Sequence, residues 1–177
     1  MTKKEIRSAM RERNRSLSAG EKAAAARRIF ERIEAMPSFR RAGCVALFCA
    51  LPDEPPTEEA LARWGREKRI VVPRVEGDTM RFFDYDPATL VRGAFGIGEP
   101  GSEAALCRPE EIDLIVVPGV AFTAGGARLG RGRGYYDRYF ALPGMRALRI
   151  GVCFAHQLVD RLPVEPHDAA MEQVCAG

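Results

Sequence analysis

The sequence predicts a single-domain α/β protein in which a largely parallel sheet lies between helical layers. Three observations support this. Short, continuous apolar runs are typical of strands covered on both faces, and they alternate along the chain with segments of helical periodicity. A glycine-rich segment joins one of these runs to an aromatic helical segment. The length of 177 residues allows one domain with a substantial core over residues 1–177, whereas two full domains would be cramped.

Two helices are expected at the N-terminal end. A helix over residues 3–14 places Ile6 and Met10 on one narrow apolar stripe beneath a basic surface, because residues four apart share a helix face. Ser18, with a glutamate three residues later, forms a capping box that starts a second helix. The apolar positions of this helix recur at helical spacing, which indicates one buried face, and Pro37 is expected to stop it.

The remaining elements are predicted from apolar runs and turn residues. Strands are expected at residues 44–50, 70–73, 80–84, 113–117 and 148–154, and helices at 58–68 (capped by Thr57) and 135–140, with a helical turn at 156–160. A short glycine turn separates the second and third strands, so this pair can add an antiparallel hairpin. The glycines and prolines of residues 86–112 predict an irregular excursion, and a brief tail is expected after residue 168.

Composition excludes several classes of protein. Apolar residues make up 46% and charged residues 29%, which is typical of a soluble globular protein rather than a disordered one. The net charge of +3 is too small to imply nucleic-acid binding by itself. No apolar stretch approaches the length of a membrane span. Five widely spaced cysteines without a secretory signal are typical of reduced thiols in a cytoplasmic protein, and two histidines offer no Cys/His metal cluster.

The most informative segment is the glycine-rich stretch over residues 118–140. Six of the chain's 17 glycines fall within it, and three arginines are interleaved with them: Arg128, Arg131 and Arg133. Glycines let backbone N–H groups approach an anion, arginines bind phosphate oxygens, and the following helix adds a partial positive charge. The segment therefore predicts a phosphate site, although it matches neither the P-loop nor a clean dinucleotide motif. A flexible surface loop is the alternative, but linkers rarely alternate arginine with glycine before two tyrosines and an aspartate.

Two further features indicate the kind of ligand. Lys3 and Arg7 belong to a group of six basic residues within the first sixteen positions, which is a second candidate anion-binding surface. Asp137 and Asp168 are carboxylates that could hold a divalent metal accompanying a nucleotide. Together these groups indicate ATP with Mg²⁺, because phosphoryl transfer depends on positioning and on stabilising charge. The plainer alternatives are a solvated helix face for Lys3 and Arg7 and a surface carboxylate for Asp168.

These features resemble the 5-formyltetrahydrofolate cyclo-ligase family over nearly the whole chain. Four segments carry the resemblance, namely KKEIR at 3–7, LPDE at 51–54, RLGRGRGYYD at 128–137 and HD at 167–168. The resemblance implies a Rossmann-like, three-layer α/β fold and a ligase that uses ATP and Mg²⁺ to convert 5-formyltetrahydrofolate to 5,10-methenyltetrahydrofolate, releasing ADP and phosphate. In the implied reaction, the formyl oxygen attacks the γ-phosphate and N10 of the folate then closes the ring, so no protein nucleophile is required.

The resemblance also implies roles for individual residues. The residues implied to bind ATP are Lys3, Arg7, Arg128, Gly130, Arg131, Gly132, Arg133, Gly134, Tyr135 and Tyr136, and Arg128 and Lys3 are also implied to be catalytic. The residues implied to bind folate are Cys49, Glu54 (on the pterin), Arg131, Gly132, Arg133, Gly134 and Tyr135. The implied metal ligands are Asp137 and Asp168.

The chain departs from the family pattern in places. Thr123 stands where the family usually has an aspartate, so a carboxylate is missing there. The C-terminal tail lacks the usual Asp near Glu172 and the usual Thr near Cys175, and Arg133 stands where many relatives have glycine. These differences affect the periphery of the implied site, and its charged residues are retained.

Two other functions remain open. A catalytically silent homologue would bind nucleotide or folate as a regulator, and loss of the charged site residues would have indicated it. A nucleic-acid-binding module would use the basic N-terminus and the arginine loop, but the weak net charge argues against it. We therefore expect a cytoplasmic monomer whose partners are ATP and 5-formyltetrahydrofolate, with or without a polyglutamate tail, and neither nucleic acid nor a membrane.

Overall fold

The computed structural model describes residues 1–93 and 96–177. The α-helices are α1 (Lys3–Ser16), α2 (Ala19–Glu34), α3 (Pro37–Arg41), α4 (Glu58–Trp64) and α5 (Tyr135–Phe140), and the 3₁₀ helices are η2 (Pro109–Glu111) and η3 (Ala155–Gln157). The strands are β1 (Cys44–Ala46), β2 (Arg69–Glu76), β3 (Thr79–Asp84), β4 (Val91–Arg92), β5 (Gly98–Glu99), β6 (Leu106–Cys107), β7 (Leu114–Pro118), β8 (Ala121–Phe122), β9 (Arg128–Leu129), β10 (Leu148–Cys153) and β11 (Gln173–Ala176).

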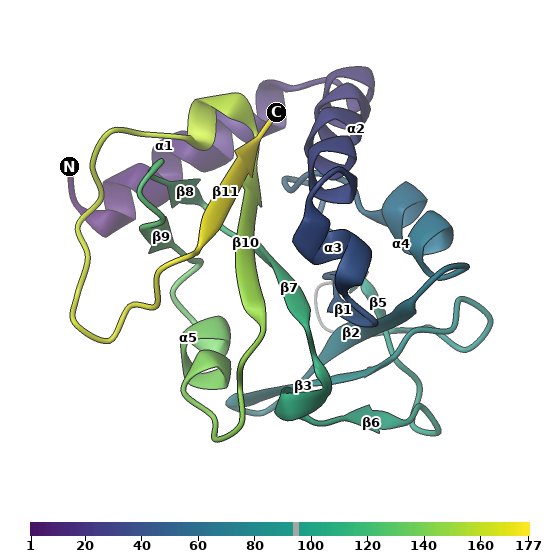
Figure 1. The fold of residues 1–177 in the computed structure, drawn as a ribbon. Coiled ribbons are helices and arrows are strands. Elements are labelled where there is room, and N and C mark those ends of the chain that lie inside the picture. Colours follow the sequence, from purple (N-terminus) through teal and green to yellow (C-terminus); the bar gives the residue numbers. More distant parts are fainter. Residues whose placement is uncertain (94–95) are drawn as a thin grey trace.

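A seven-stranded sheet forms the centre of the molecule, with the strand order β11-β10-β7-β1-β2-β3-β6 (Figure 1). The pairings from β11 through β2 are parallel, whereas β3 pairs antiparallel with both β2 and β6. Both the largely parallel sheet and the antiparallel hairpin predicted from the sequence are therefore confirmed.

The apolar strands are buried on both faces, as their continuous apolar sequences predict. In β7, Leu114 and Val116 join a core cluster with α2, α3 and α4, whereas Ile115 and Val117 join a second cluster on the opposite face, with α5. This alternation follows from the two-residue period of a strand. The sheet consequently lies between two helical layers, and α5 and the α2–α4 group lie on different sides of it in Figure 1.

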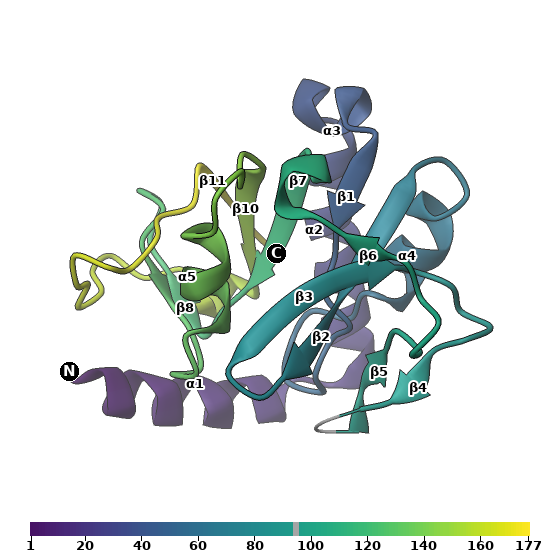
Figure 2. The same ribbon diagram turned by 90° about the horizontal axis from the view of Figure 1, so that it is seen from below.

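Helix α1 packs on a third apolar cluster, separate from the two clusters on the faces of the sheet. Its apolar residues Ile6 and Met10 pack against Ala121 and Leu129 of the small β8–β9 hairpin, which follows the carboxyl end of β7. Figure 2 shows α1 extended along one end of the sheet. The remaining face of α1, which carries basic side chains, is thus available to border a site at the carboxyl ends of the parallel strands.

Several predicted boundaries were wrong, and the strand expected over 70–73 spans Arg69–Glu76. The strand expected over 44–50 ends at Ala46, because the chain leaves the sheet after the Leu47 N–H donates to the carbonyl oxygen of Val71 (3.0 Å). Pro37 begins helix α3 instead of only ending the helix before it. Proline suits the first turn of a helix, where the backbone N–H has no intrahelical partner.

Thr57 was expected to cap the next helix, and it does stand at the N-cap position of α4. Its side chain makes no capping hydrogen bond to α4. Its hydroxyl oxygen instead accepts a hydrogen bond from the N–H of Ala50 at 3.1 Å, and Thr57 is itself buried. Thr57 therefore closes the loop between β1 and α4, and the helix ends at Trp64 rather than at residue 68.

Several short elements were missed. The segment 86–112 contains β4, β5, β6 and η2, so the prediction of little regular structure was wrong for its described part, and residues 94–95 lie outside the described residues. The glycine-rich stretch contains the β8–β9 hairpin. The C-terminal tail forms β11, which pairs with β10 at the edge of the sheet. All are two- to four-residue elements, too short for a sequence period to establish.

Candidate active site

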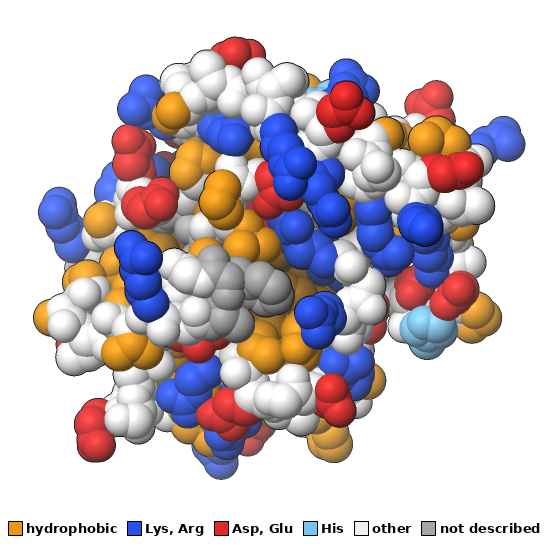
Figure 3. All heavy atoms as spheres, turned by 180° about the vertical axis from the view of Figure 1, so that it is seen from behind, with side chains coloured by type: hydrophobic (Ala, Val, Ile, Leu, Met, Phe, Trp, Pro, Cys, Tyr) orange, Lys and Arg blue, Asp and Glu red, His pale blue; other side chains and the backbone are white. Residues whose placement is uncertain are grey.

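One cavity of about 840 Å³ lies between α1, the loop after β1 and the glycine-rich segment. All of the site residues predicted from the sequence line it, namely Lys3, Arg7, Cys49, Glu54, Arg128, Gly130, Arg131, Gly132, Arg133, Gly134, Tyr135, Tyr136, Asp137 and Asp168. Figure 3 shows a hollowed face of the molecule on which Lys and Arg side chains gather beside hydrophobic ones. The structure therefore brings into one place residues that are up to 165 positions apart.

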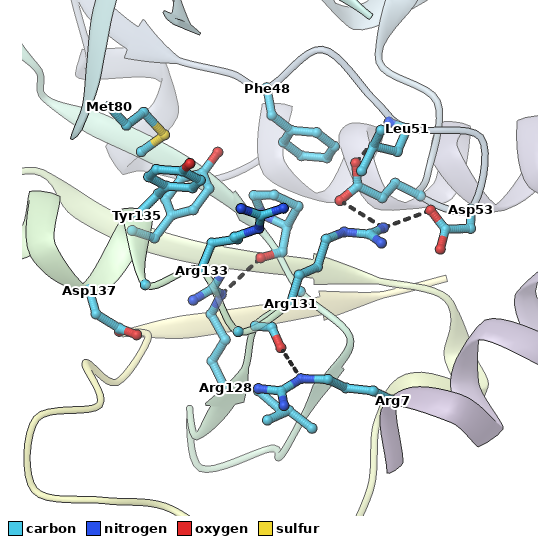
Figure 4. A pocket seen from close by; sticks show the side chains of 18 of the residues that line it. Arg7, Phe48, Leu51, Asp53, Met80, Arg128, Arg131, Arg133, Tyr135 and Asp137 are labelled. Atoms are coloured by element: carbon cyan, nitrogen blue, oxygen red, sulfur yellow. Dashed lines mark hydrogen bonds and ion pairs between the residues drawn. The ribbon is translucent and has the colours of Figure 1, made fainter. Parts of the chain in front are cut away.

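The glycine-rich segment holds Arg128 in a fixed position. This residue lies on β9, where its Nε donates to the carbonyl oxygen of Pro118 at 2.8 Å, and its guanidinium lies 5.1 Å from the centre of the Tyr136 ring. Burial lowers the pKa of Arg128, but an arginine remains charged at any physiological pH. The side chain is thus a fixed cation at the floor of the cavity, and Arg131 and Arg133 extend toward the same space (Figure 4).

Two glycines in the loop are required by its backbone. Gly132 has φ +102° and Gly134 has φ +74°, both in the region that favours glycine. A Cβ on Gly132 would lie at an ordinary contact distance of 3.5 Å from the guanidinium of Arg7, so the backbone angle alone requires glycine here. Arg7 donates from Nε to the carbonyl oxygen of Gly130 at 2.9 Å, so the N-terminal helix contacts the loop directly. The two surfaces that were predicted separately to bind anions are therefore continuous.

The opposite wall of the cavity carries a buried carboxylate. Glu54 is only 7% exposed, and its Oε1 accepts a hydrogen bond from the N–H of Leu51 at 2.8 Å. Burial raises the pKa of Glu54, and the positive charge of Arg131 opposes this shift. Arg131 lies 3.5 Å from Oε2 of Glu54 and donates at 2.6 Å to Oδ1 of Asp53 (Figure 4).

A group of acidic residues borders a third side of the cavity. Asp168 Oδ2 lies 3.4 Å from Nζ of Lys3 and accepts from the N–H of Glu165 at 2.8 Å. Although burial alone raises the pKa of Asp168, these two contacts outweigh it and lower the value. Asp137 accepts from the N–H of Ala169 at 3.2 Å, next to Asp168 in the chain. The two predicted metal ligands therefore border the same side of the cavity.

The acidic group is larger than the sequence indicated. Ligand atoms of Glu165, His167 and Asp168 lie within 4.8 Å of one another, although the grouping does not include Asp137. Glu165 also pairs with Lys3 at 3.4 Å. His167 had no role predicted from the sequence, and Glu165 was missed. Carboxylate oxygens at this border are the ligands that Mg²⁺ prefers.

The space between the two charged walls is apolar. Phe48, Val75 and Met80 line it, and so do Cys49 and Tyr136. Burial raises the pKa of the Cys49 thiol to about 11, so this thiol stays protonated near neutral pH, and burial also raises the pKa of Tyr136. Such an interior suits a flat heterocycle that enters with a polar edge toward Glu54.

Other basic residues of the cavity had no individual role predicted, although Arg11 and Arg15 belong to the six basic residues near the N-terminus. Arg11 and Arg15 line it together with Lys3 and Arg7, and Lys22 extends the same border. The four α1 residues recur every four positions, so they share one helix face, and this spacing could have identified them. Met80 and Val75 belong to the β2–β3 hairpin and carry no comparable signal in the sequence.

The fold and the cavity define a Rossmann-like α/β protein with a large pocket that joins an arginine- and glycine-rich loop to a buried carboxylate. The chain belongs to the 5-formyltetrahydrofolate cyclo-ligase family, because the model of that family matches residues 1–177. The sequence resemblance is thereby confirmed.

Relatives with known names agree with this membership. The chain is 37% identical over 113 residues to a 5-formyltetrahydrofolate cyclo-ligase of Mycolicibacterium smegmatis, a match that spans 60% of this chain and 58% of the relative. It is 27% identical to the mouse cyclo-ligase over 97% of this chain and 92% of the relative. An NMR structure of Aquifex aeolicus 5,10-methenyltetrahydrofolate synthetase superposes with a TM-score of 0.89 at 33% identity, covering 99% of this chain and 90% of that one.

A second solved structure supports the fold alone. It is a 5,10-methenyltetrahydrofolate synthetase from Mycoplasma pneumoniae, with a TM-score of 0.80 at 24% identity. Among the residues described, no helix combines the length and the apolar character needed to cross a lipid bilayer.

Proposed function

We propose that this chain catalyses the ATP- and Mg²⁺-dependent conversion of 5-formyltetrahydrofolate to 5,10-methenyltetrahydrofolate, with release of ADP and phosphate. One observation carries the proposal: a single cavity is lined both by the glycine–arginine loop with Lys3 and Arg7 and by the buried Glu54. A reaction between ATP and a folate requires both ligands in one space, because the phosphoryl group must reach the formyl oxygen in line.

The first step is a phosphoryl transfer. The formyl oxygen of the folate attacks the γ-phosphorus, an O–P bond forms, and the bond to the ADP oxygen breaks. Arg128 and Lys3 would stabilise the negative charge on the transferred group. Arg7 and the N–H groups of residues 130–134 would surround the remaining phosphate oxygens. Because Arg128 is held by Pro118, it needs little reorganisation during the reaction.

Asp137 and Asp168 are the residues that would hold Mg²⁺. Their carboxylates fit a hard cation, and the lowered pKa of Asp168 keeps that side chain ionised at neutral pH. Magnesium bound there would neutralise charge on the phosphates of ATP. In the free protein Lys3 is paired with Asp168. When another cation binds this carboxylate, the Lys3 side chain can turn toward the phosphates.

The second step is ring closure. N10 of the folate attacks the activated formyl carbon, a C–N bond forms, N10 loses its proton to solvent, and the C–O bond to phosphate breaks. Glu54 would hold the pterin by accepting hydrogen bonds from its N–H groups, while Cys49 and Tyr135 contact the ring system. The protonated thiol of Cys49 acts only through packing, since the reaction needs no protein nucleophile.

The test is the rise in near-ultraviolet absorbance that accompanies formation of 5,10-methenyltetrahydrofolate. We expect a rise only when purified protein, ATP, Mg²⁺ and 5-formyltetrahydrofolate are all present, and none when any one of them is omitted. Binding of ATP or folate by calorimetry without any absorbance rise would instead favour the silent homologue. Steeply salt-dependent binding of single-stranded nucleic acid, with no turnover, would favour the nucleic-acid module.

The proposal also covers the cellular compartment of the enzyme, its oligomeric state and the form of its folate substrate. All five cysteines are free thiols, in keeping with a reducing, cytoplasmic compartment. We propose a monomer that binds the folate with or without a polyglutamate tail. Size-exclusion chromatography with light scattering and a comparison of KM for monoglutamate and triglutamate substrates test these two points.

A further inference from the structure

We propose that Asn14 is a positioning residue for the folate side of the cavity. This inference rests on the function proposed above. Asn14 holds the backbone of Asp53, and the Asp53 side chain in turn holds Arg131 beside Glu54. Nothing in the sequence analysis gave Asn14 a role beyond ending a helix.

Asn14 is a buried polar side chain, only 4% exposed, in the last turn of α1. Its Nδ2 donates to the carbonyl oxygen of Asp53 at 3.0 Å, and its Oδ1 lies 2.5 Å from Nε2 of His156. Because Nδ2 must face a carbonyl oxygen, Oδ1 is the acceptor, and His156 must carry a proton on Nε2. The amide is therefore fixed at both ends, and one end holds the loop over residues 51–54.

The contacts continue from Asp53 into the site. The Asp53 carboxylate accepts from Nη2 of Arg131 at 2.6 Å, and the same nitrogen lies 3.5 Å from the Glu54 carboxylate. A small cavity of about 20 Å³ beside the main one is lined by Asn14, Asp53 and Arg131 together. A displacement of the Asp53 backbone would thus move Arg131 away from Glu54.

The loop over residues 51–54 depends on this contact. Two further hydrogen bonds lie within the loop: the Glu54 N–H donates to the carbonyl oxygen of Leu51 at 3.0 Å, and the Leu51 N–H donates to the Glu54 side chain at 2.8 Å. Lys22 donates to the carbonyl oxygen of Pro52 at 2.9 Å, but this contact is exposed to solvent. The hydrogen bond from the buried Asn14 side chain is partly shielded from solvent, and site geometry must hold to about 0.5 Å for efficient catalysis.

The alternative is that Asn14 only joins α1 to the η3 turn that carries His156. Two variants separate these roles. Asn14→Asp keeps an acceptor for His156 and removes the donor to Asp53, whereas His156→Gln keeps an N–H donor for Asn14 and disturbs only the η3 end. Asn14→Ala removes both contacts and replaces Asn14→Asp if that variant does not fold.

The experiment combines steady-state kinetics with hydrogen exchange at the backbone amides of residues 50–54. For Asn14→Asp we expect the folate KM to rise at least about fivefold, the size of one lost hydrogen bond, with kcat and the ATP KM within twofold. We also expect faster exchange in residues 50–54. In His156→Gln the folate KM should stay within twofold of its value in the unmodified protein, even if the melting temperature changes.

Folded Asn14 variants with an unchanged folate KM and unchanged exchange would overturn the proposal, as would an equal rise in folate KM in His156→Gln. A lack of turnover in the unmodified protein would instead refute the proposed function. In that case the exchange measurement still decides whether Asn14 holds the loop.

Discussion

The guanidinium of Arg7 donates a hydrogen bond to the carbonyl oxygen of Gly130, 123 residues further along the chain. This contact attaches the basic face of α1 to the glycine–arginine loop and makes them one border of the cavity. Two segments that each resemble a weak anion site in the sequence are consequently parts of one surface.

The first prediction concerns this contact. Arg7→Ala should raise the ATP KM about tenfold, because one charge-assisted contact is worth roughly 1.5 kcal/mol. The folate KM should change by less than twofold. Arg13→Ala is the matched control, since Arg13 is exposed on the same helix and does not line the cavity. Equal effects of the two substitutions would show that only the net charge of α1 matters.

Arg128 is predicted to contribute to the chemical step itself. Arg128→Ala should lower kcat by about 10²–10³, corresponding to roughly 3–4 kcal/mol of lost charge stabilisation, while circular dichroism shows an intact fold. Arg138→Ala serves as the control, because Arg138 donates to the carbonyl oxygen of Asp78 outside the cavity. A kcat near that of the unmodified protein in Arg128→Ala would contradict the assignment.

Glu54 is predicted to act on the folate and not on ATP. Glu54→Gln replaces an acceptor by a group that offers one oxygen and an unwanted donor, so the folate KM should rise about tenfold or more. The ATP KM should change much less. Initial rates measured over a matrix of both substrates give the two constants, and a larger change in the ATP constant would be incompatible with a pterin role.

Glu54→Gln is also expected to change how the free energy of unfolding depends on pH. Burial raises the pKa of Glu54 above its ordinary value of 4.5, so the folded protein holds this proton to higher pH than the unfolded chain does. Stability from this group is therefore present below pH 4.5 and is lost as pH rises through the raised pKa, by about 1.4 kcal/mol per pKa unit.

Glu54→Gln has no such loss. Relative to the unmodified protein, its free energy of unfolding should increase between pH 4.5 and pH 8, as measured by urea titration at several pH values. A constant difference across this range would show that Arg131 compensates fully for the buried charge.

Asp137 is predicted to affect the magnesium requirement. Asp137→Asn should raise the Mg²⁺ concentration for half-maximal rate by about tenfold, since an amide is a weaker ligand than a carboxylate. Asp160→Asn is the control, because Asp160 is exposed and does not line the cavity. An unaltered magnesium dependence in Asp137→Asn would leave the metal to Asp168, Glu165 and His167.

The parts of the structure that the sequence predicted correctly carry strong local signals. Val45 and Ile70 lie in continuous apolar runs, and such runs become central strands because both faces are covered. Arg128 and Gly132 belong to one contiguous loop, so their proximity required no knowledge of the fold. The hydrophobic stripe of α1 was likewise predicted from Ile6 and Met10.

The missed features depend on distant contacts. Thr57 has the sequence pattern of a helix cap, but a backbone N–H seven residues earlier competes for its hydroxyl. The ion pair between Asp53 and Arg131 joins residues 78 positions apart, and no local pattern encodes it. β11 is an edge strand whose four residues alternate only partly, and its pairing with β10 determines its structure.

The most direct test of the central claim is the fate of the formyl oxygen. 5-Formyltetrahydrofolate labelled with ¹⁸O at the formyl group would be converted by the protein with ATP and Mg²⁺, and the released phosphate analysed by mass spectrometry. Attack of that oxygen on the γ-phosphate predicts one ¹⁸O atom in each phosphate formed. Product formation with unlabelled phosphate, and the label in water, would contradict the account.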